Sequence, residues 1–127
     1  MKRNDVLALA ARVEAATGAD RELDVLVALA KGWRKESARD WFTPPGVNVR
    51  HHKTELPRYT ASLDDAMSLV PSGLILRNYQ SSRFVPHSCE VALSWAHGGW
   101  LGNSDHSFAL ALTAAALRAI AWSMTDD

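Results

Sequence analysis

The first third of the chain repeats apolar residues at helical spacing in two successive segments. The first segment follows an N-cap at Asn4 or Asp5, and its apolar residues recur every three or four positions. The second begins at Asp20 and ends before Gly32, with acidic residues in its first turn and a lysine in its last. The pattern predicts a helical hairpin over residues 5–31.

The helical pattern is lost over residues 33–57, where prolines and a glycine interrupt the chain and Val47 to Lys53 is the only candidate strand. It returns at Ser62-Leu63-Asp64-Asp65, which has the form of a capping box. We expect a short helix over residues 62–70.

Alternation of apolar and polar residues is clearest after residue 74 and predicts a β-hairpin over residues 74–95. One buried face is expected to carry His87, Cys89, Val91, Leu93 and Trp95. Residues 97–106 contain three glycines and several short polar residues, which predicts a loop or a lid. An alanine- and leucine-rich helix with a single charge, Arg118, is expected over residues 108–124.

This order of elements predicts one α+β domain that spans residues 1–127, with a small antiparallel sheet and about four helices in layers. The length suits a single hydrophobic core. There is no stretch of about 20 apolar residues and no signal-peptide cleavage pattern, so we expect a cytoplasmic protein that does not enter a membrane. The single cysteine, Cys89, excludes an intrachain disulfide.

The charge balance argues against general nucleic-acid binding, because 14 basic residues face 14 acidic ones. The charges are unevenly spread, however. Residues 91–127 contain only one basic side chain, so a site for an anion is expected before residue 90.

No catalytic or metal-binding signature is present. His87 and Cys89 lie two residues apart, as two ligands on one strand would, with His97, Asp105 or His106 to complete a site. Their place among apolar residues favours burial instead, so we expect no metal. The same burial argues against a Cys89 nucleophile. Asp64 and Asp65 are explained by capping. We therefore expect no catalytic residues and no cofactor.

The strongest candidate site is an anion-binding surface that combines cationic and aromatic side chains. Basic residues cluster before residue 60, and aromatic residues, among them Trp41, fall in or near loops where a nucleotide base could stack. The alternative is a solvated strand edge protected by its charges, with tryptophans that cover a small core. The residues expected to bind a ligand are Arg50, His51, Lys53, Arg58, Tyr79, Arg83 and Trp100.

Two stretches resemble the small bacteriophage domain called the phage ABA sandwich. They are Tyr59 to Gly73 (YTASLDDAMSLVPSG) and Ala109 to Ala119 (ALALTAAALRA), and the N-terminal Asp20 to Asp24 and Gly32-Trp33 also resemble the opening of such proteins. The resemblance implies an α-β-α layered fold and a phage origin, with the cytoplasm of the infected bacterium as the location. It implies no catalytic residues.

These expectations favour a non-enzymatic phage accessory protein that binds and sequesters a small ligand. A nucleotide signal of bacterial immunity, such as a cyclic nucleotide or an ADP-ribose-type compound, is the ligand class we expect, by analogy with other small phage proteins. The alternative is a protein–protein interaction or structural module, which would present helix faces to a partner or to a second copy of the chain. A nucleotide hydrolase is the least favoured function.

Overall fold

The computed structural model describes residues 1–36, 40–81, 89–95, 98–104 and 106–124. Within these residues the chain forms four α-helices, one 3₁₀ helix and two three-stranded antiparallel sheets. The α+β class is confirmed. In chain order the elements are α1 (Arg3–Ala15), α2 (Arg21–Lys31), β1 (Arg34–Lys35), β2 (Trp41–Thr43), β3 (His51–His52), η1 (Lys53–Glu55), α3 (Leu63–Met67), β4 (Ile75–Ser81), β5 (Cys89–Trp95), β6 (Gly98–Ser104) and α4 (Phe108–Trp122).

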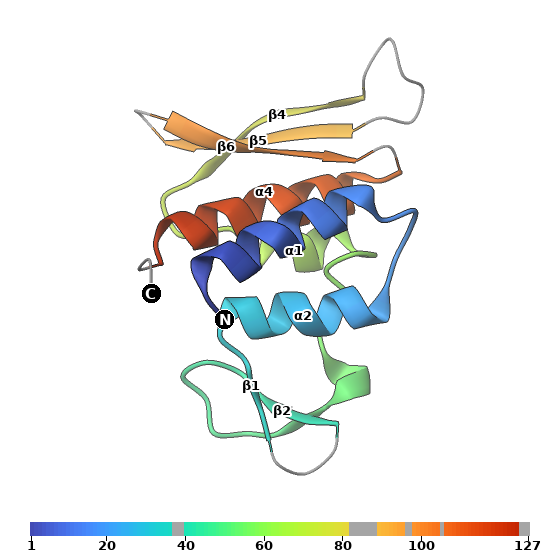
Figure 1. Cartoon of the computed structure of the whole chain (residues 1–127), viewed down its shortest axis with the longest axis vertical. Helices are drawn as coiled ribbons and strands as arrows, with labels where there is room; N and C mark the ends of the chain where they lie inside the picture. Colours follow the sequence, from blue (N-terminus) through green and yellow to red (C-terminus); the bar gives the residue numbers. More distant parts are fainter. Residues whose placement is uncertain (37–39, 82–88, 96–97, 105, 125–127) are drawn as a thin grey trace.

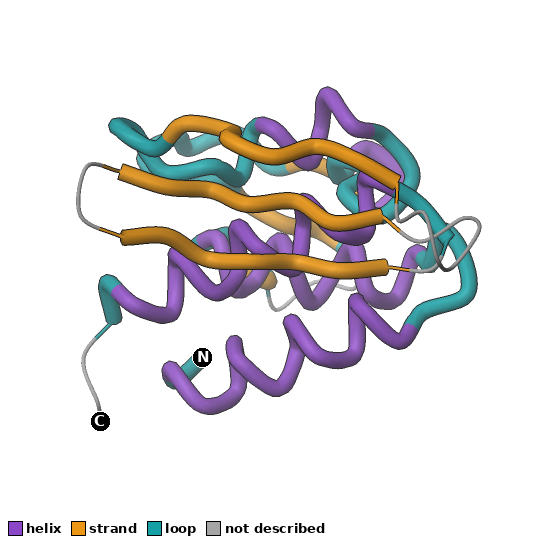
Figure 2. Tube along the Cα trace, turned by 90° about the horizontal axis from the view of Figure 1, so that it is seen from above, coloured by secondary structure: helices purple, strands orange, loops and turns teal. Residues whose placement is uncertain are grey.

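The helices form the middle of the molecule. Figure 1 shows the β4-β5-β6 sheet at one end, then α4 and α1, then α2, and the small β1-β2-β3 sheet at the other end. Seen from above, the three longer strands cover the helices on one side (Figure 2). The layers therefore differ from the α-β-α order that the resemblance implied, because the described helices all lie on one face of the larger sheet.

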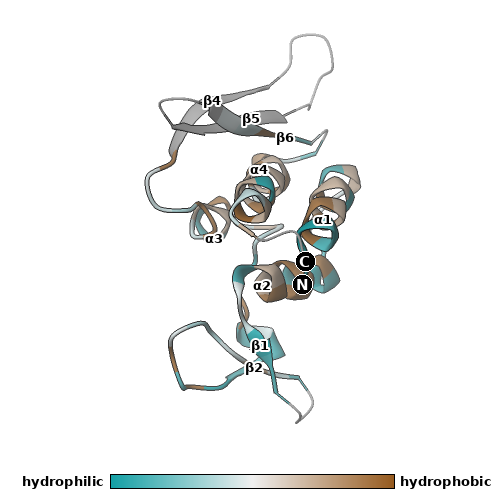
Figure 3. Ribbon diagram, turned by 60° about the vertical axis from the view of Figure 1, so that its left-hand side comes forward, coloured by the Kyte–Doolittle hydropathy of each residue, from teal (hydrophilic) through white to brown (hydrophobic). Residues whose placement is uncertain are grey.

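Helix α4 is the centre of the core. The side-chain oxygen of Ser107 caps its start by accepting the N–H of Leu110 at 3.1 Å, and eleven of its fifteen residues are buried. An apolar helix with so little exposed surface must be covered on several sides. Figure 3 shows hydrophobic residues where the helices face one another. No helix in the described ranges has the length and apolar character needed to cross a membrane.

The glycine-rich segment predicted as a loop is the strand β6. The expectation of a loop over 97–106 is wrong for residues 98–104, which pair along their whole length with β5. Gly102 explains the composition: a Cβ at this position would come within 2.6 Å of the backbone nitrogen of Ala115 and still closer to the carbonyl oxygen of Ala111. Glycine in a strand marks such a close approach of two backbones.

The predicted ends of α2 are confirmed, whereas α3 ends at Met67, before the predicted end at residue 70. Asp20 caps α2 by accepting the N–H groups of Glu22 and Leu23, and Gly32 ends it in the left-handed conformation with φ of 113°. Helix α1, however, starts earlier than expected. Lys2 holds its N-cap position, and Asp5 lies in the first turn and accepts the backbone N–H of Lys2.

The region 33–57 contains more strand than the sequence pattern showed. Of the predicted strand Val47–Lys53, only His51 and His52 are extended and paired. Two further short strands, β1 and β2, complete the sheet. The β-hairpin 74–95 is confirmed as the antiparallel pair β4 and β5, whereas its tip at residues 82–88, with His87, lies outside the described residues.

Candidate functional site

The β1-β2-β3 sheet has one face against the helices and one face outward. Its register pairs Phe42 with His51 and Trp41 with His52. Phe42 is buried, and side chains alternate along a strand, so Trp41 and His52 lie on the opposite, outer face. In Figure 1 this sheet lies beyond α2, at the end of the molecule farthest from β4-β5-β6.

Three side chains meet on the outer face and form what we call the Trp41 surface, which comprises Trp41, Arg50 and His52. The guanidinium carbon of Arg50 lies 5.7 Å from the centre of the Trp41 ring. The His52 ring meets the same indole edge-on, with 5.3 Å between ring centres. Trp41 is 37% exposed. A cation within about 6 Å of an indole centre is held by the quadrupole of the ring.

The inner face of the sheet packs on a second aromatic pair. Trp33 follows the end of α2, and its ring meets His51 edge-on at 5.7 Å between centres. Tyr59 is also buried. Burial raises the pKa of the Tyr59 hydroxyl to about 12, although a hydrogen bond with Trp33 acts in the opposite direction. We therefore interpret the contacts of the inner face as packing that supports the position of the sheet.

The turn after β3 fixes the two histidines. The Nδ1 atom of the His52 ring accepts the backbone N–H of Thr54 at 3.2 Å. The backbone N–H of His52 donates to the Glu55 carboxylate at 2.9 Å. That N–H lowers the pKa of the Glu55 carboxyl. The result is a capping box for η1 in which His52 occupies the N-cap position.

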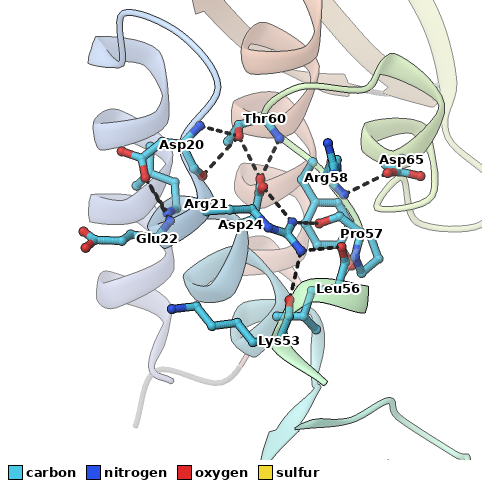
Figure 4. Close-up of polar contacts among 12 residues, drawn as sticks. Asp20, Arg21, Glu22, Asp24, Lys53, Leu56, Pro57, Arg58, Thr60 and Asp65 are labelled. Atoms are coloured by element: carbon cyan, nitrogen blue, oxygen red, sulfur yellow. Dashed lines mark hydrogen bonds and ion pairs between the residues drawn. The ribbon is translucent and has the colours of Figure 1, made fainter. Parts of the chain in front are cut away.

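Arg21 anchors this end of the molecule to α2. Its guanidinium donates to the carbonyl oxygens of Lys53 and Leu56 at 2.9 Å and of Pro57 at 3.1 Å, as Figure 4 shows. It also pairs with Asp24 at 3.0 Å. Arg21 was not among the residues predicted from the sequence to have a role. Its position in the first turn of α2, three residues before an aspartate, was the only signal.

Asp24 completes the anchor. Its side chain is buried, and one carboxylate oxygen accepts both the backbone N–H and the hydroxyl of Thr60 at 2.8 Å each (Figure 4). A buried carboxylate is tolerated only when it is paired and hydrogen-bonded, and here Arg21 and Thr60 meet both conditions. The segment from η1 to Thr60 is thus tied to α2 by charge-assisted hydrogen bonds.

The predicted ligand-binding residues do not all come together. Arg50, His51 and Lys53 share the β1-β2-β3 end, although His51 faces inward. The N–H of Arg58 donates to Asp65, at the start of α3 (Figure 4). Tyr79 and Trp100 belong to the sheet at the other end of the molecule.

The residues predicted to bind one ligand therefore do not form a single site, because the helices separate the two sheets that contain Arg50 and Trp100. Trp100 contacts Trp122 instead, with 6.3 Å between ring centres. Arg83 lies outside the described residues.

Two hollows lie along α1. One has a volume of about 210 Å³ and the other about 290 Å³, and Arg12 borders both. Each is smaller than the roughly 300–1,000 Å³ of a typical small-molecule pocket. They lack an aromatic side chain, so the Trp41 surface remains the better candidate for binding a flat ligand.

The side chains of the Trp41 surface are of the types that bind anionic and aromatic ligands. Arginine offers a planar set of donors to phosphate or carboxylate, and indole offers a stacking face. Among residues 31–58, seven Lys and Arg side chains outnumber three Asp and Glu, although the whole chain is neutral. Groups of three or more metal-binding side chains do not occur within the described part of the chain.

Searches against protein-family models, curated proteins and solved structures found no match to this chain.

Proposed function

We propose that this chain is a non-enzymatic binding protein and that it takes a small anionic ligand with an aromatic base at the Trp41 surface. The observation that carries the proposal is the guanidinium of Arg50 above the exposed ring of Trp41, at 5.7 Å. Together they offer a charge for phosphate and a ring for a base. Nucleotides have both features, and single-stranded nucleotide binding commonly combines them.

The rigidity of the surface supports this proposal. Arg21 and Asp24 tie η1 to α2, and His52 is held at the N-cap of η1. A ligand would then meet side chains that are already positioned, which lowers the entropy cost of binding. With the resemblance to a phage domain, sequestration of a nucleotide signal of bacterial immunity is the role we propose.

The experiment is a calorimetric titration with cyclic dinucleotides, cyclic oligonucleotides and ADP-ribose. We expect one compound to bind, and Arg50→Ala to weaken it by about 10- to 150-fold, since a charge-assisted hydrogen bond is worth about 1.5–3 kcal/mol. Arg58→Ala is the matched control, because this arginine is exposed and its backbone N–H donates to Asp65 at the start of α3, outside the β1-β2-β3 sheet. Equal losses from both variants, or no heat from any compound, would contradict the proposal.

One observation favours a second candidate, a protein–protein interaction module. Val47 and Val49 are 49% and 57% exposed, and they lie in the segment between β2 and β3, next to Arg50. Exposed apolar residues beside an arginine and a tryptophan are typical of the centre of a protein interface. Capture of a protein by the wild-type chain but not by Val47→Ser/Val49→Ser, with no small-molecule binding, would favour this candidate.

A further inference from the structure

Strand β6 lies at the outer edge of its sheet, next to β5 on one side. Its residues alternate in burial: Gly102 and Ser104 are buried against the helices, whereas Leu101 and Asn103 are exposed. In an antiparallel strand, the N–H and C=O groups of alternate residues point to the same side. The backbone groups of Leu101 and Asn103 point away from β5, because both bond to side chains from the helices.

Those side chains are Glu14 of α1 and Arg118 of α4. The Glu14 carboxylate accepts the N–H of Asn103 at 2.8 Å, and the Arg118 guanidinium donates to the carbonyl oxygen of Leu101 at 2.7 Å. The two side chains also pair with each other, with 2.6 Å between a nitrogen and an oxygen. They thus supply the acceptor and the donor that a neighbouring strand would offer.

The rest of the strand has little that would discourage pairing. Residues 98–104 read GGWLGNS, without proline or a charged side chain, and the chain has no net charge to keep copies apart. Natural edge strands usually carry such groups, because a free edge is a template for pairing with another chain. Protection here comes from Glu14 and Arg118, which belong to other elements.

We propose that the outer edge of β6 is a latent pairing surface for β6 of a second copy of this chain, and that the Glu14–Arg118 pair keeps it closed. With the pair in place, the edge groups at residues 101 and 103 are already bonded and the chain stays monomeric. Without the pair, those groups bond to the same groups of a second copy. This inference does not depend on the Trp41 surface.

The test is the mass of Glu14→Ala/Arg118→Ala by sedimentation velocity. Removing both partners leaves no unpaired charge. We expect a dimer at about 100 µM, a concentration at which exposed edges associate, and a monomer for the wild type. Arg12→Ala/Glu22→Ala is the matched control, since it removes one exposed base and one exposed acid from α1 and α2. A folded but monomeric double variant, or a dimeric wild type, would overturn the proposal.

Two further measurements separate edge pairing from loss of structure. Adding Leu101→Lys to the double variant should restore the monomer, because a lysine on an edge strand hinders pairing, and a persistent dimer would overturn the inference. In the wild type, the amide of Asn103 should exchange with solvent as slowly as amides that pair within the sheet. Rapid exchange would show that Glu14 does not close the edge.

Discussion

Gly102 of β6 lies against the backbone of Ala111 in α4, with no room for a side chain between them. A Cβ at position 102 would collide with the carbonyl oxygen of Ala111, which is part of a buried helix and cannot move aside. Gly102→Ala should therefore lower the free energy of unfolding by about 3 kcal/mol, at the upper end of typical overpacking costs. Urea denaturation followed by circular dichroism measures this change.

Gly18→Ala is the control for that substitution. Apart from the glycine itself and its two chain neighbours, no atom lies within 4 Å of a Cβ at position 18. Alanine there should leave stability unchanged or raise it by less than about 1 kcal/mol, since it restricts the unfolded chain. If both variants lose stability equally, the close packing of β6 on α4 is not the reason for glycine at position 102.

The buried carboxylate of Asp24 gives a second prediction. Asp24→Ala removes the carboxylate that pairs with Arg21 and that accepts both the N–H and the hydroxyl of Thr60. The variant should lose about 3 kcal/mol of unfolding free energy. Glu22→Ala, on the same helix but exposed, should cost less than about 1 kcal/mol. A comparable loss in both variants would show that the contacts of Asp24 with Arg21 and Thr60 contribute little to the free energy of unfolding.

The Glu14 carboxylate should make the free energy of unfolding depend on pH. Burial alone would raise its pKa, but the hydrogen bonds from Arg118 and from the Asn103 N–H outweigh it, and the pKa in the folded chain is lowered. The contribution of Glu14 to stability is therefore present above its unfolded value near 4.5 and is lost as the pH falls through the folded value.

Glu14→Gln should flatten this acid limb of the stability profile, measured by urea denaturation at a series of pH values. At neutral pH the variant should be less stable than the wild type, and the difference should shrink in acid. A difference that stays constant down to the acid limit would contradict the lowered pKa.

The ends of α2 could be predicted because their signals are local. Asp20 and Gly32 flank α2, and each acts through contacts within a few residues. The role of Gly102 could not be predicted, since the atoms that require a glycine belong to α4. Taken alone, residues 97–106 have the composition of a loop.

In the candidate site, too, local features could be predicted and contacts between distant segments could not. Arg50, His51 and Lys53 are neighbours along the chain, so their shared location could be predicted. The contact of Trp41 with His52 depends on the register of β2 and β3, which no local pattern specified. The separation of Trp100 from this cluster depends on the helices that lie between the two sheets.

The most direct test of the proposed binding site is a titration followed by the indole N–H signals of the five tryptophans in a nitrogen-15 NMR spectrum. Assignment by single Trp→Phe variants identifies each signal. With the nucleotide that gives heat in calorimetry, we predict that the Trp41 signal shifts. The signals of Trp100 in β6 and Trp122 in α4, which contact each other, should not shift. Shifts confined to Trp100 and Trp122, or binding that leaves Trp41 unchanged, would contradict the account.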